Sequence, residues 1–296
     1  MTPPGFGPPS LPPAWWGGDG GGEPVERSIT ALIADRTLDA ELAALLWLLV
    51  EAGVPIVLAG PRRSGRTTVL TALLAFLAAE SRTILLEGGD EDFASVPEAV
   101  ELGWRREARA PAPVLRLPGT VLLAAELADR PPLGVSGERA LIVVRALSLG
   151  YGLATTIEAA GLDQAFAALR GGDVGAGADE LAGLGIVVVL GERAVGAAPS
   201  ITVAHYVRPL ARDPNGHVQR LPPAVLAARD ARSGRLEHFS WGISDELAGR
   251  TGRRSVDLER EQALRSGLLA RLAAAGIVDP VEVRDAVAAW RPGAGT

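Results

Sequence analysis

The residues from Gly60 to Thr68 carry the clearest chemical signal in the sequence. The spacing Gly60-x4-Gly65, followed by a basic residue and two threonines, matches a phosphate-binding loop. Glycines at these places let successive backbone N–H groups turn toward phosphate oxygens. A helix that begins at the end of the loop would direct its positive end at the same phosphates. The predicted ligand-binding residues are Gly60, Pro61, Arg62, Arg63, Ser64, Gly65, Arg66, Thr67 and Thr68.

The residue after Gly65 departs from the usual form of this loop. Arg66 stands where the pattern has lysine, and the two differ because guanidinium is planar and forked whereas ammonium is a compact point charge. In the pattern the basic residue reaches the β- and γ-phosphates of a nucleotide, and the next residue, here Thr67, ligates Mg²⁺. The sequence contains no lysine, so a bias in coding also explains the arginine. Two interpretations stay open: loose binding of ATP and Mg²⁺ with poor hydrolysis, or a loop that is a relic.

Two carboxylates stand at the ends of short apolar runs. Glu87 closes residues 83–87 and Glu126 closes residues 120–126, and both runs have the length and composition of buried strands. Open α/β sheets bind their ligands at the carboxyl ends of strands, so we expect both carboxylates near the loop. The alternative for each is a strand-end charge that faces the solvent.

These residues need a scaffold of alternating strands and helices. The loop follows an apolar run at 54–59 and opens a predicted helix at 67–79, and the same alternation continues to residue 190. This predicts a mainly parallel sheet covered on both faces. After residue 200, turns separate the strands, which predicts an antiparallel extension, and helices close the chain. Further helices are predicted at 25–52, 136–149, 162–170, 243–251, 255–275 and 280–290, and further strands at 83–87, 120–126, 152–157, 186–190, 200–208, 224–229 and 235–241.

Composition excludes several classes of function. The 296-residue chain has a formal net charge of −6, which argues against a broad surface for nucleic acid. It has no cysteine, so disulfides and thiolate metal sites are excluded. The longest apolar stretch, residues 43–60, is interrupted by Glu51 and Pro55 and is too short to span a bilayer. With no visible secretory signal, we expect a cytoplasmic protein without a membrane span. The histidines lack the spacing of metal ligands: His205, His217 and His238.

The chain divides into three predicted parts. Residues 1–24 are rich in proline and glycine and cannot bury enough surface to order themselves. Residues 25–242 contain the alternating pattern and form the predicted nucleotide-binding domain, and residues 243–296 form a predicted helical subdomain. In the tail, the pair Trp15-Trp16 is either incidental or a docking motif for a partner.

Over residues 28–290 the order of motifs resembles the type II/type IV secretion ATPases, especially their tight-adherence pilus and archaeal-type branch. The loop 60–68, the segment Ile84–Glu91 and the segment Val121–Asp129 resemble the phosphate loop, the acidic box and the Walker B strand of that superfamily. Residues 145–159 resemble its histidine box, and residues 264–290 its C-terminal helices. The resemblance implies a RecA-like P-loop NTPase core. In it, Glu87 orients the attacking water, and Thr67 and Glu126 hold Mg²⁺.

The departures from that superfamily share one direction. Gly88 stands where a second carboxylate is usual, and Ala125 precedes Glu126 where glycine is usual. Glu158 takes the place of the histidine, which puts an anion where a sensor of the γ-phosphate is expected. Only the predicted tail precedes residue 25, so we also expect the N-terminal domain of the superfamily to be missing. Together with Arg66, these changes indicate a degenerate member.

Two hypotheses for function follow. The first is an ATPase subunit that binds and weakly hydrolyses ATP with Mg²⁺ for a secretion or pilus-assembly system. The second is an inactive pseudo-ATPase that serves such a system as an assembly or regulatory partner. The resemblance implies membrane-platform proteins as partners, a hexamer with itself or with a full-length ATPase, and a location at the inner face of the membrane through those partners. A DNA motor is disfavoured because the chain is acidic.

Overall fold

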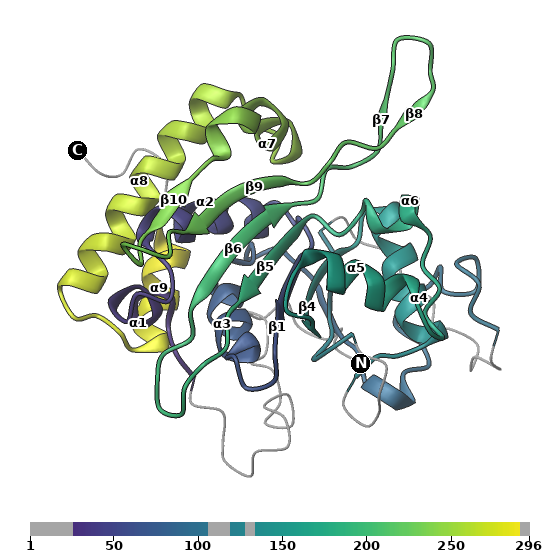
Figure 1. Ribbon diagram of the computed structural model, residues 1–296, viewed down its shortest axis with the longest axis horizontal. Helices are drawn as coiled ribbons and strands as arrows, with labels where there is room; N and C mark the ends of the chain where they lie inside the picture. Colours follow the sequence, from purple (N-terminus) through teal and green to yellow (C-terminus); the bar gives the residue numbers. More distant parts are fainter. Residues whose placement is uncertain (1–25, 106–118, 128–133, 291–296) are drawn as a thin grey trace, which may run out of the picture.

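A large, mainly parallel sheet forms the centre of the molecule in the computed structural model, which describes residues 26–105, 119–127 and 134–290 (Figure 1). Its strand order is β10-β9-β6-β5-β1-β4-β3-β2. The parallel strands are β1 (Ile56–Gly60), β2 (Thr83–Leu85), β3 (Val121–Leu123), β4 (Gly152–Glu158) and β5 (Ile186–Leu190). The antiparallel strands are β6 (Ile201–Tyr206), β9 (Ala224–Arg229) and β10 (Leu236–His238). The predicted α/β class, with an antiparallel extension, is confirmed.

Helices cover both faces of this sheet. Alternate residues of β1 enter two separate hydrophobic clusters: Ile56 and Leu58 join one, and Val57 and Ala59 join the other, as the two-residue period of a strand requires. Because both faces are covered, every residue of β1 is buried. The first cluster includes α2 (Ala40–Glu51), α3 (Arg66–Leu73), α8 (Ser255–Ala274) and α9 (Pro280–Ala289). The second includes α4 (Glu138–Ala146), α5 (Leu162–Arg170) and α6 (Ala178–Leu181).

The connections leave β1 and β4 in opposite directions. From β1 the chain runs through α3 to β2 at the far edge, whereas from β4 it runs through α5 and α6 back past β1 to β5. In open α/β sheets, such a reversal creates a crevice at the carboxyl ends of the two neighbouring strands, and ligands bind there. The neighbours of β1 are β4 and β5, so the order differs from the 3-2-1-4-5-6 order of dinucleotide-binding sheets.

The helical pattern predicted over residues 25–52 corresponds to two helices in the structure. Residues 29–51 form α1 (Ile29–Ala34) and α2, separated by a turn in which Arg36 has φ 59°. Asp39 begins the second helix, because its side chain accepts a hydrogen bond from the backbone N–H of Leu42. The predicted tail of residues 1–24, with its tryptophan pair, lies outside the described residues.

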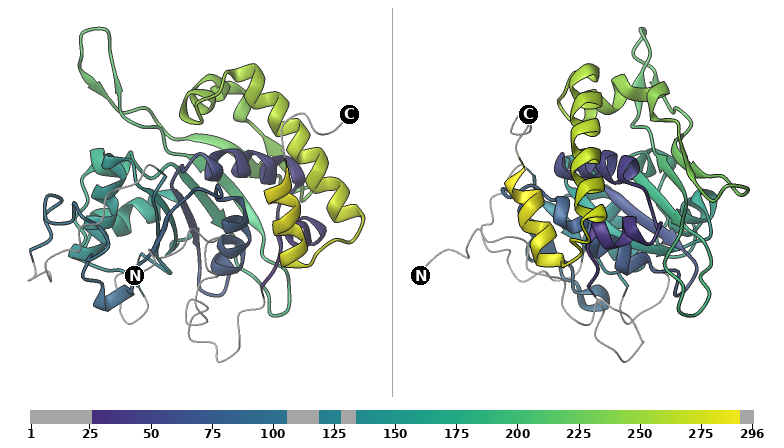
Figure 2. Two further views of the ribbon diagram at one scale, coloured as in Figure 1. Left: turned by 180° about the vertical axis from the view of Figure 1, so that it is seen from behind. Right: turned by 90° about the vertical axis from the view of Figure 1, so that its left-hand side faces the viewer.

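The first and last helices form one layer, seen from two further sides in Figure 2. The hydroxyls of Ser28 and Thr30, at the start of α1, donate to the carbonyls of Val278 and Ile277, both at 2.7 Å. The predicted C-terminal helices are present as α7 (Ser244–Arg250), α8 and α9. These helices pack in the same hydrophobic cluster as β1, so they have no separate core. The predicted domain boundary between residues 242 and 243 stays a prediction. Among the described residues, no helix is long and apolar enough to cross a membrane.

A narrow hairpin extends from the antiparallel part of the sheet (Figure 1). It consists of β7 (Ala211–Arg212) and β8 (Val218–Gln219), joined by the turn at 213–216 that the sequence Asp-Pro-Asn-Gly predicts. Arg220, which follows β8, is tied to Asp179 of α6 at 2.6 Å.

Candidate functional site

The predicted phosphate loop joins the carboxyl end of β1 to the N-terminus of α3. The loop begins as a turn, in which the backbone N–H of Ser64 donates to the carbonyl of Pro61 at 3.2 Å. Arg63 has φ 61° and Gly65, the residue before the helix, has φ 95°. Helix α3 therefore starts at Arg66, just beyond the carboxyl end of β1, and the N–H groups of its first turn have no partners within the helix. The strand, loop and helix occur in the predicted order.

The two glycines of the loop are also required by close neighbours. A Cβ atom at Gly60 would lie 2.5 Å from the hydroxyl of Ser64 and 3.1 Å from the carbonyl oxygen of Leu190. A Cβ atom at Gly65 would lie 2.5 Å from the ring of Pro199. The Ser64 hydroxyl is buried and has no hydrogen-bond partner among the described residues. The loop therefore packs closely against both β1 and the connection that follows β5.

Arg66 and Glu126 meet above the end of β4. The guanidinium Nη1 of Arg66 donates to a carboxylate oxygen of Glu126 at 2.8 Å, with the two side chains 11% and 28% exposed. Glu126 follows β3, and β4 lies between β3 and β1. The backbone around Glu126 is fixed, because the Thr156 hydroxyl donates to the carbonyl of Ala125 and the Leu127 N–H donates to the carbonyl of Thr156. The structure therefore brings together two residues that the sequence assigned to one site.

Glu158 lies at the end of β4, paired in register with Gly60. Its carboxylate accepts a hydrogen bond from Nε of Arg62 at 3.1 Å, and the side chains are 50% and 74% exposed. An ion pair this exposed contributes little to stability. It does offset the charge of Glu158, the anion that stands where a sensor of the γ-phosphate is expected, through a neighbour within the loop.

The second predicted carboxylate, Glu87, is exposed just beyond β2, at the edge of the sheet. The turn around it is organised by Glu91, a buried carboxylate that accepts from the backbone N–H of Glu87 at 2.7 Å and of Phe93 at 2.6 Å. Burial raises the pKa of Glu91. The carbonyl of Glu91 accepts from Arg139 of α4 at 2.8 Å. Glu87 and Glu126 thus follow neighbouring strands, and the structure places Glu126, not Glu87, in contact with the loop.

The threonines of the loop lie in the first turn of α3 and are partly buried. The carbonyl of Thr67 accepts from the hydroxyl of Thr71 at 2.6 Å, and the Thr67 hydroxyl itself makes no hydrogen bond among the described residues. Among the described residues, no group of three or more His, Asp or Glu side chains could hold a metal ion by itself. Mg²⁺ commonly binds through one or two protein ligands plus substrate phosphates, and one hydroxyl with one carboxylate fits that donor set.

One contact near the loop was not predicted from the sequence. The connection between β5 and β6, residues 191–200, packs against the loop through Pro199. Pro199 and Gly65 are distant in the sequence and belong to no common motif, so no local signal could have paired them. The predicted strands on either side, 186–190 and 200–208, were the only available indication that a connection ends here.

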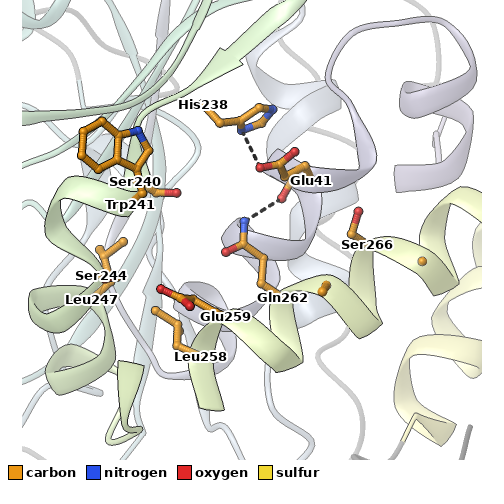
Figure 3. Close-up of a pocket in the computed structure, with 12 residues that line it drawn as sticks. Glu41, His238, Ser240, Trp241, Ser244, Leu247, Leu258, Glu259, Gln262 and Ser266 are labelled. Carbon is orange, nitrogen blue, oxygen red and sulfur yellow. Dashed lines mark hydrogen bonds and ion pairs between the residues drawn. The ribbon is translucent and has the colours of Figure 1, made fainter. Parts of the chain in front are cut away.

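An open groove of about 630 Å³ lies elsewhere, between α2, β10, α7 and α8 (Figure 3). None of the predicted site residues lines it. His238 closes one end: its Nε2 lies 2.9 Å from Asp39 and its Nδ1 lies 3.8 Å from Glu41. Burial lowers the pKa of His238, but the hydrogen bond and charges of these two carboxylates outweigh burial, so the pKa is raised. The groove is a feature of the helical layer and not of the phosphate loop.

Comparison with known proteins gives one significant similarity. The chain is 31% identical over 151 residues to the uncharacterized protein MJ0900 of Methanocaldococcus jannaschii. The match covers 50% of this chain and 27% of that relative, so the chain spans about a quarter of the length of the protein it matches. No protein-family model matches the chain.

Proposed function

We propose that this protein binds ATP with Mg²⁺ at the loop 60–68 on a RecA-like P-loop core and hydrolyses it slowly. The observation that carries the proposal is the contact between Arg66 and Glu126 across the end of β4. A basic residue at the start of α3 and a carboxylate at the end of β3 converge on the crevice where open α/β sheets bind ligands. That convergence joins two motifs that were identified separately in the sequence.

Each group has a role that its position supports. The N–H groups at the start of α3 and the guanidinium of Arg66 would bind the β- and γ-phosphates. Thr67 and Glu126 would hold Mg²⁺, which when bound neutralises charge on the phosphate oxygens. On binding, the ion pair between Arg66 and Glu126 would have to separate. Glu126 would then bind the metal, and Arg66 would bind phosphate. The exception is Glu87, which follows β2 at the sheet edge. That it would orient the attacking water for in-line displacement of the γ-phosphate is proposed from the sequence resemblance alone.

The slow rate follows from the charges around the loop. Arg66 is a forked cation in a place suited to a compact one, and it is already engaged by Glu126. Glu158 is an anion beside the loop, and Arg62, which would otherwise attract phosphate, is partly occupied by it. Binding therefore has to replace two existing ion pairs, so we expect modest affinity and weak turnover.

A Mg²⁺-ATPase assay on the purified 296-residue chain tests this function, with ATP binding measured in parallel by calorimetry. Glu126→Gln is the matched control, since it keeps the size of the side chain and removes its charge. We expect micromolar to submillimolar binding and slow phosphate release that the control lacks. Failure to bind ATP, with or without Mg²⁺, would sink the proposal.

The alternative is a pseudo-ATPase that binds ATP without turnover and acts as an assembly or regulatory partner. The Arg62–Glu158 pair favours it, because Glu158 replaces a histidine in the motif that residues 145–159 resemble. The two functions differ in one experiment: the double substitution Arg66→Lys, Glu158→His should accelerate an existing reaction in the first case. In the second case it should create turnover where the unmodified chain has none.

The biological setting is proposed from the sequence resemblance alone. We propose that the protein serves a secretion or pilus-assembly system, with membrane-platform proteins as partners and assembly into a hexamer with itself or with a full-length ATPase. Co-purification with an adjacent-gene platform protein, and mass measurement of the purified chain with and without ATP, test these two statements. A monomer under all conditions that binds no platform protein would contradict them.

A further inference from the structure

The connection between β5 and β6 flanks the phosphate loop at both of its ends. Leu190, where the chain enters the connection, lies against Gly60, and Pro199, where the chain leaves it, lies against Gly65. The backbone N–H of Gly191 donates to the carbonyl of Ser200 at 3.0 Å and closes residues 191–200 into a hairpin. This hairpin extends past the edge of the sheet at which β1 ends (Figure 1). The base of the hairpin 191–200 therefore packs against the phosphate loop 60–68.

The hairpin presents a cation and an apolar side chain to the solvent. Arg193 is exposed and has no hydrogen bond or ion pair among the described residues. Val195 is fully exposed, next to a tight turn in which the Ala197 N–H donates to the carbonyl of Ala194. Neither side chain supports the fold, because neither is buried. Both are exposed on a hairpin whose base contacts the phosphate loop.

The sheet order gives the orientation of such a ligand. The carboxylates Glu158 and Glu126 follow β4 and β3, on one side of β1, whereas the hairpin follows β5 on the other side. Mg²⁺ and the terminal phosphates belong on the carboxylate side, where a metal ligand is available. The nucleoside at the other end of the phosphate chain must then leave the loop toward β5.

We propose that the hairpin 191–200 is the nucleoside-binding part of the site and that it takes nucleotides with little preference among the bases. The guanidinium of Arg193 stacks on the base, as planar guanidinium does on aromatic faces, and Val195 covers the base edge. Stacking depends on the π-face that all bases share, so ATP and GTP bind with similar affinity. This inference rests on the proposed binding of nucleotide at the loop 60–68.

Titration calorimetry with three ligands tests the inference: Mg²⁺-ATP, Mg²⁺-GTP and Mg²⁺-tripolyphosphate, which has the phosphates without a nucleoside. In the full-length chain, Arg193→Ala and Val195→Asp should each weaken ATP and GTP about tenfold, or 1.4 kcal/mol. Tripolyphosphate affinity should stay within about twofold. Val218→Asp, at an exposed valine of the distant β7–β8 hairpin, is the matched control and should change nothing.

The outcomes separate the two proposals. Unchanged ATP affinity in both hairpin variants, or equal loss of ATP and tripolyphosphate affinity, would overturn the nucleoside assignment while leaving the phosphate site in place. A preference of the unmodified chain above about tenfold for one purine would overturn the stacking contact. Absence of binding of all three ligands by the unmodified chain would overturn the phosphate site and this inference together.

Discussion

Arg66 is the residue on which the chemistry of the site depends most directly. Its guanidinium is almost buried and bonded to Glu126, so in the absence of ligand its charge is already compensated. Phosphate and Mg²⁺ arriving together provide a new anion for Arg66 and a new cation for Glu126. Phosphate arriving alone would leave Glu126 unpaired beside an anion. Nucleotide and metal should therefore bind cooperatively at this pair.

We expect Arg66→Ala to weaken Mg²⁺-ATP binding about 10- to 100-fold, because a charge-assisted hydrogen bond contributes about 1.5–3 kcal/mol. Arg66→Lys should retain most of the affinity, since the charge remains. Calorimetry on both variants measures the effect, with the exposed Arg232→Ala as the matched control for loss of one arginine. Equal affinities for Arg66→Ala and the unmodified chain would remove Arg66 from the site.

His238 and Asp39 give a second prediction at the scale of single residues. Burial raises the pKa of Asp39, but its hydrogen bonds to His238 and Leu42 and the charges of His238 and Arg229 outweigh burial, so the pKa is lowered. The pKa of His238 is raised. Protonated His238 therefore stabilises the fold below about pH 6.5, and this contribution is lost as the pH rises through the raised pKa. Ionised Asp39 stabilises above about pH 4, and that contribution is lost as the pH falls.

The pair should thus contribute most between about pH 4 and pH 6.5. We expect His238→Gln to lower the free energy of unfolding by about 1 kcal/mol at pH 5.5, a figure reduced for the part-exposed Asp39. The difference should shrink as the pH rises through the raised pKa of His238, because His238 then loses its charge in the unmodified chain. Urea unfolding at several pH values measures this. A difference that grows with pH would contradict the assignment.

At the scale of elements, periodicity predicted the regular parts well and their ends less well. The strands at 186–190 and 224–229 and the helix at 162–170 coincide with β5, β9 and α5, because each has a clean apolar pattern bounded by turns. The runs at 83–87 and 120–126 were predicted too long, since β2 and β3 end at residues 85 and 123. Beyond residue 123 the regular strand pairing ends, and Thr156 instead bonds Ala125 and Leu127, the two neighbours of Glu126. A strand end that is set by such long-range contacts cannot be predicted from a single sequence.

The contact between the loop and the β5–β6 hairpin makes Gly65→Ala a test at this scale. Alanine there must adopt φ 95° and also displace Pro199. We expect the free energy of unfolding to fall by about 1–3 kcal/mol for the strained backbone, with a further loss from the clash. Tripolyphosphate binding should weaken as the loop shifts.

Gly234→Ala is the matched control for Gly65→Ala. Gly234 has φ 68° and no atom within 4 Å of an added Cβ, so it reports the backbone strain alone. The double variant Gly65→Ala, Pro199→Ala should recover part of the difference between the two single variants, as measured by urea unfolding. Equal effects of Gly65→Ala and Gly234→Ala would show that the hairpin does not press on the loop.

At the scale of the whole molecule, the helical layer is held by contacts between the two ends of the sequence. Arg265 of α8 is 1% exposed and lies over the rings of Trp47 and Trp290, 4.6 and 4.3 Å from their centroids, and the two rings contact each other edge to face. It donates to Glu51 at 2.7 Å. The sequence predicted these helices but not their docking, because an arginine in a helix normally indicates a solvent-facing position. Only the fold shows that this one is enclosed.

Arg265→Ala should lower the free energy of unfolding by about 2–4 kcal/mol, because it opens a cavity beside the two tryptophans. It also leaves Glu51 and the largely buried Glu261 with Arg253 as their remaining shared partner. Arg265→Met should cost less, since its side chain still fills the space beside the two tryptophan rings. Urea unfolding followed by tryptophan fluorescence measures both, with Arg260→Ala on the exposed side of the same helix as control, within about 0.5 kcal/mol of the unmodified chain. Because Arg265 makes its contacts with Trp47, Trp290 and Glu51 and not with the loop 60–68, the folded fraction of Arg265→Met should bind Mg²⁺-ATP with unchanged affinity. Weakened binding there would mean that the helical layer and the phosphate site are coupled.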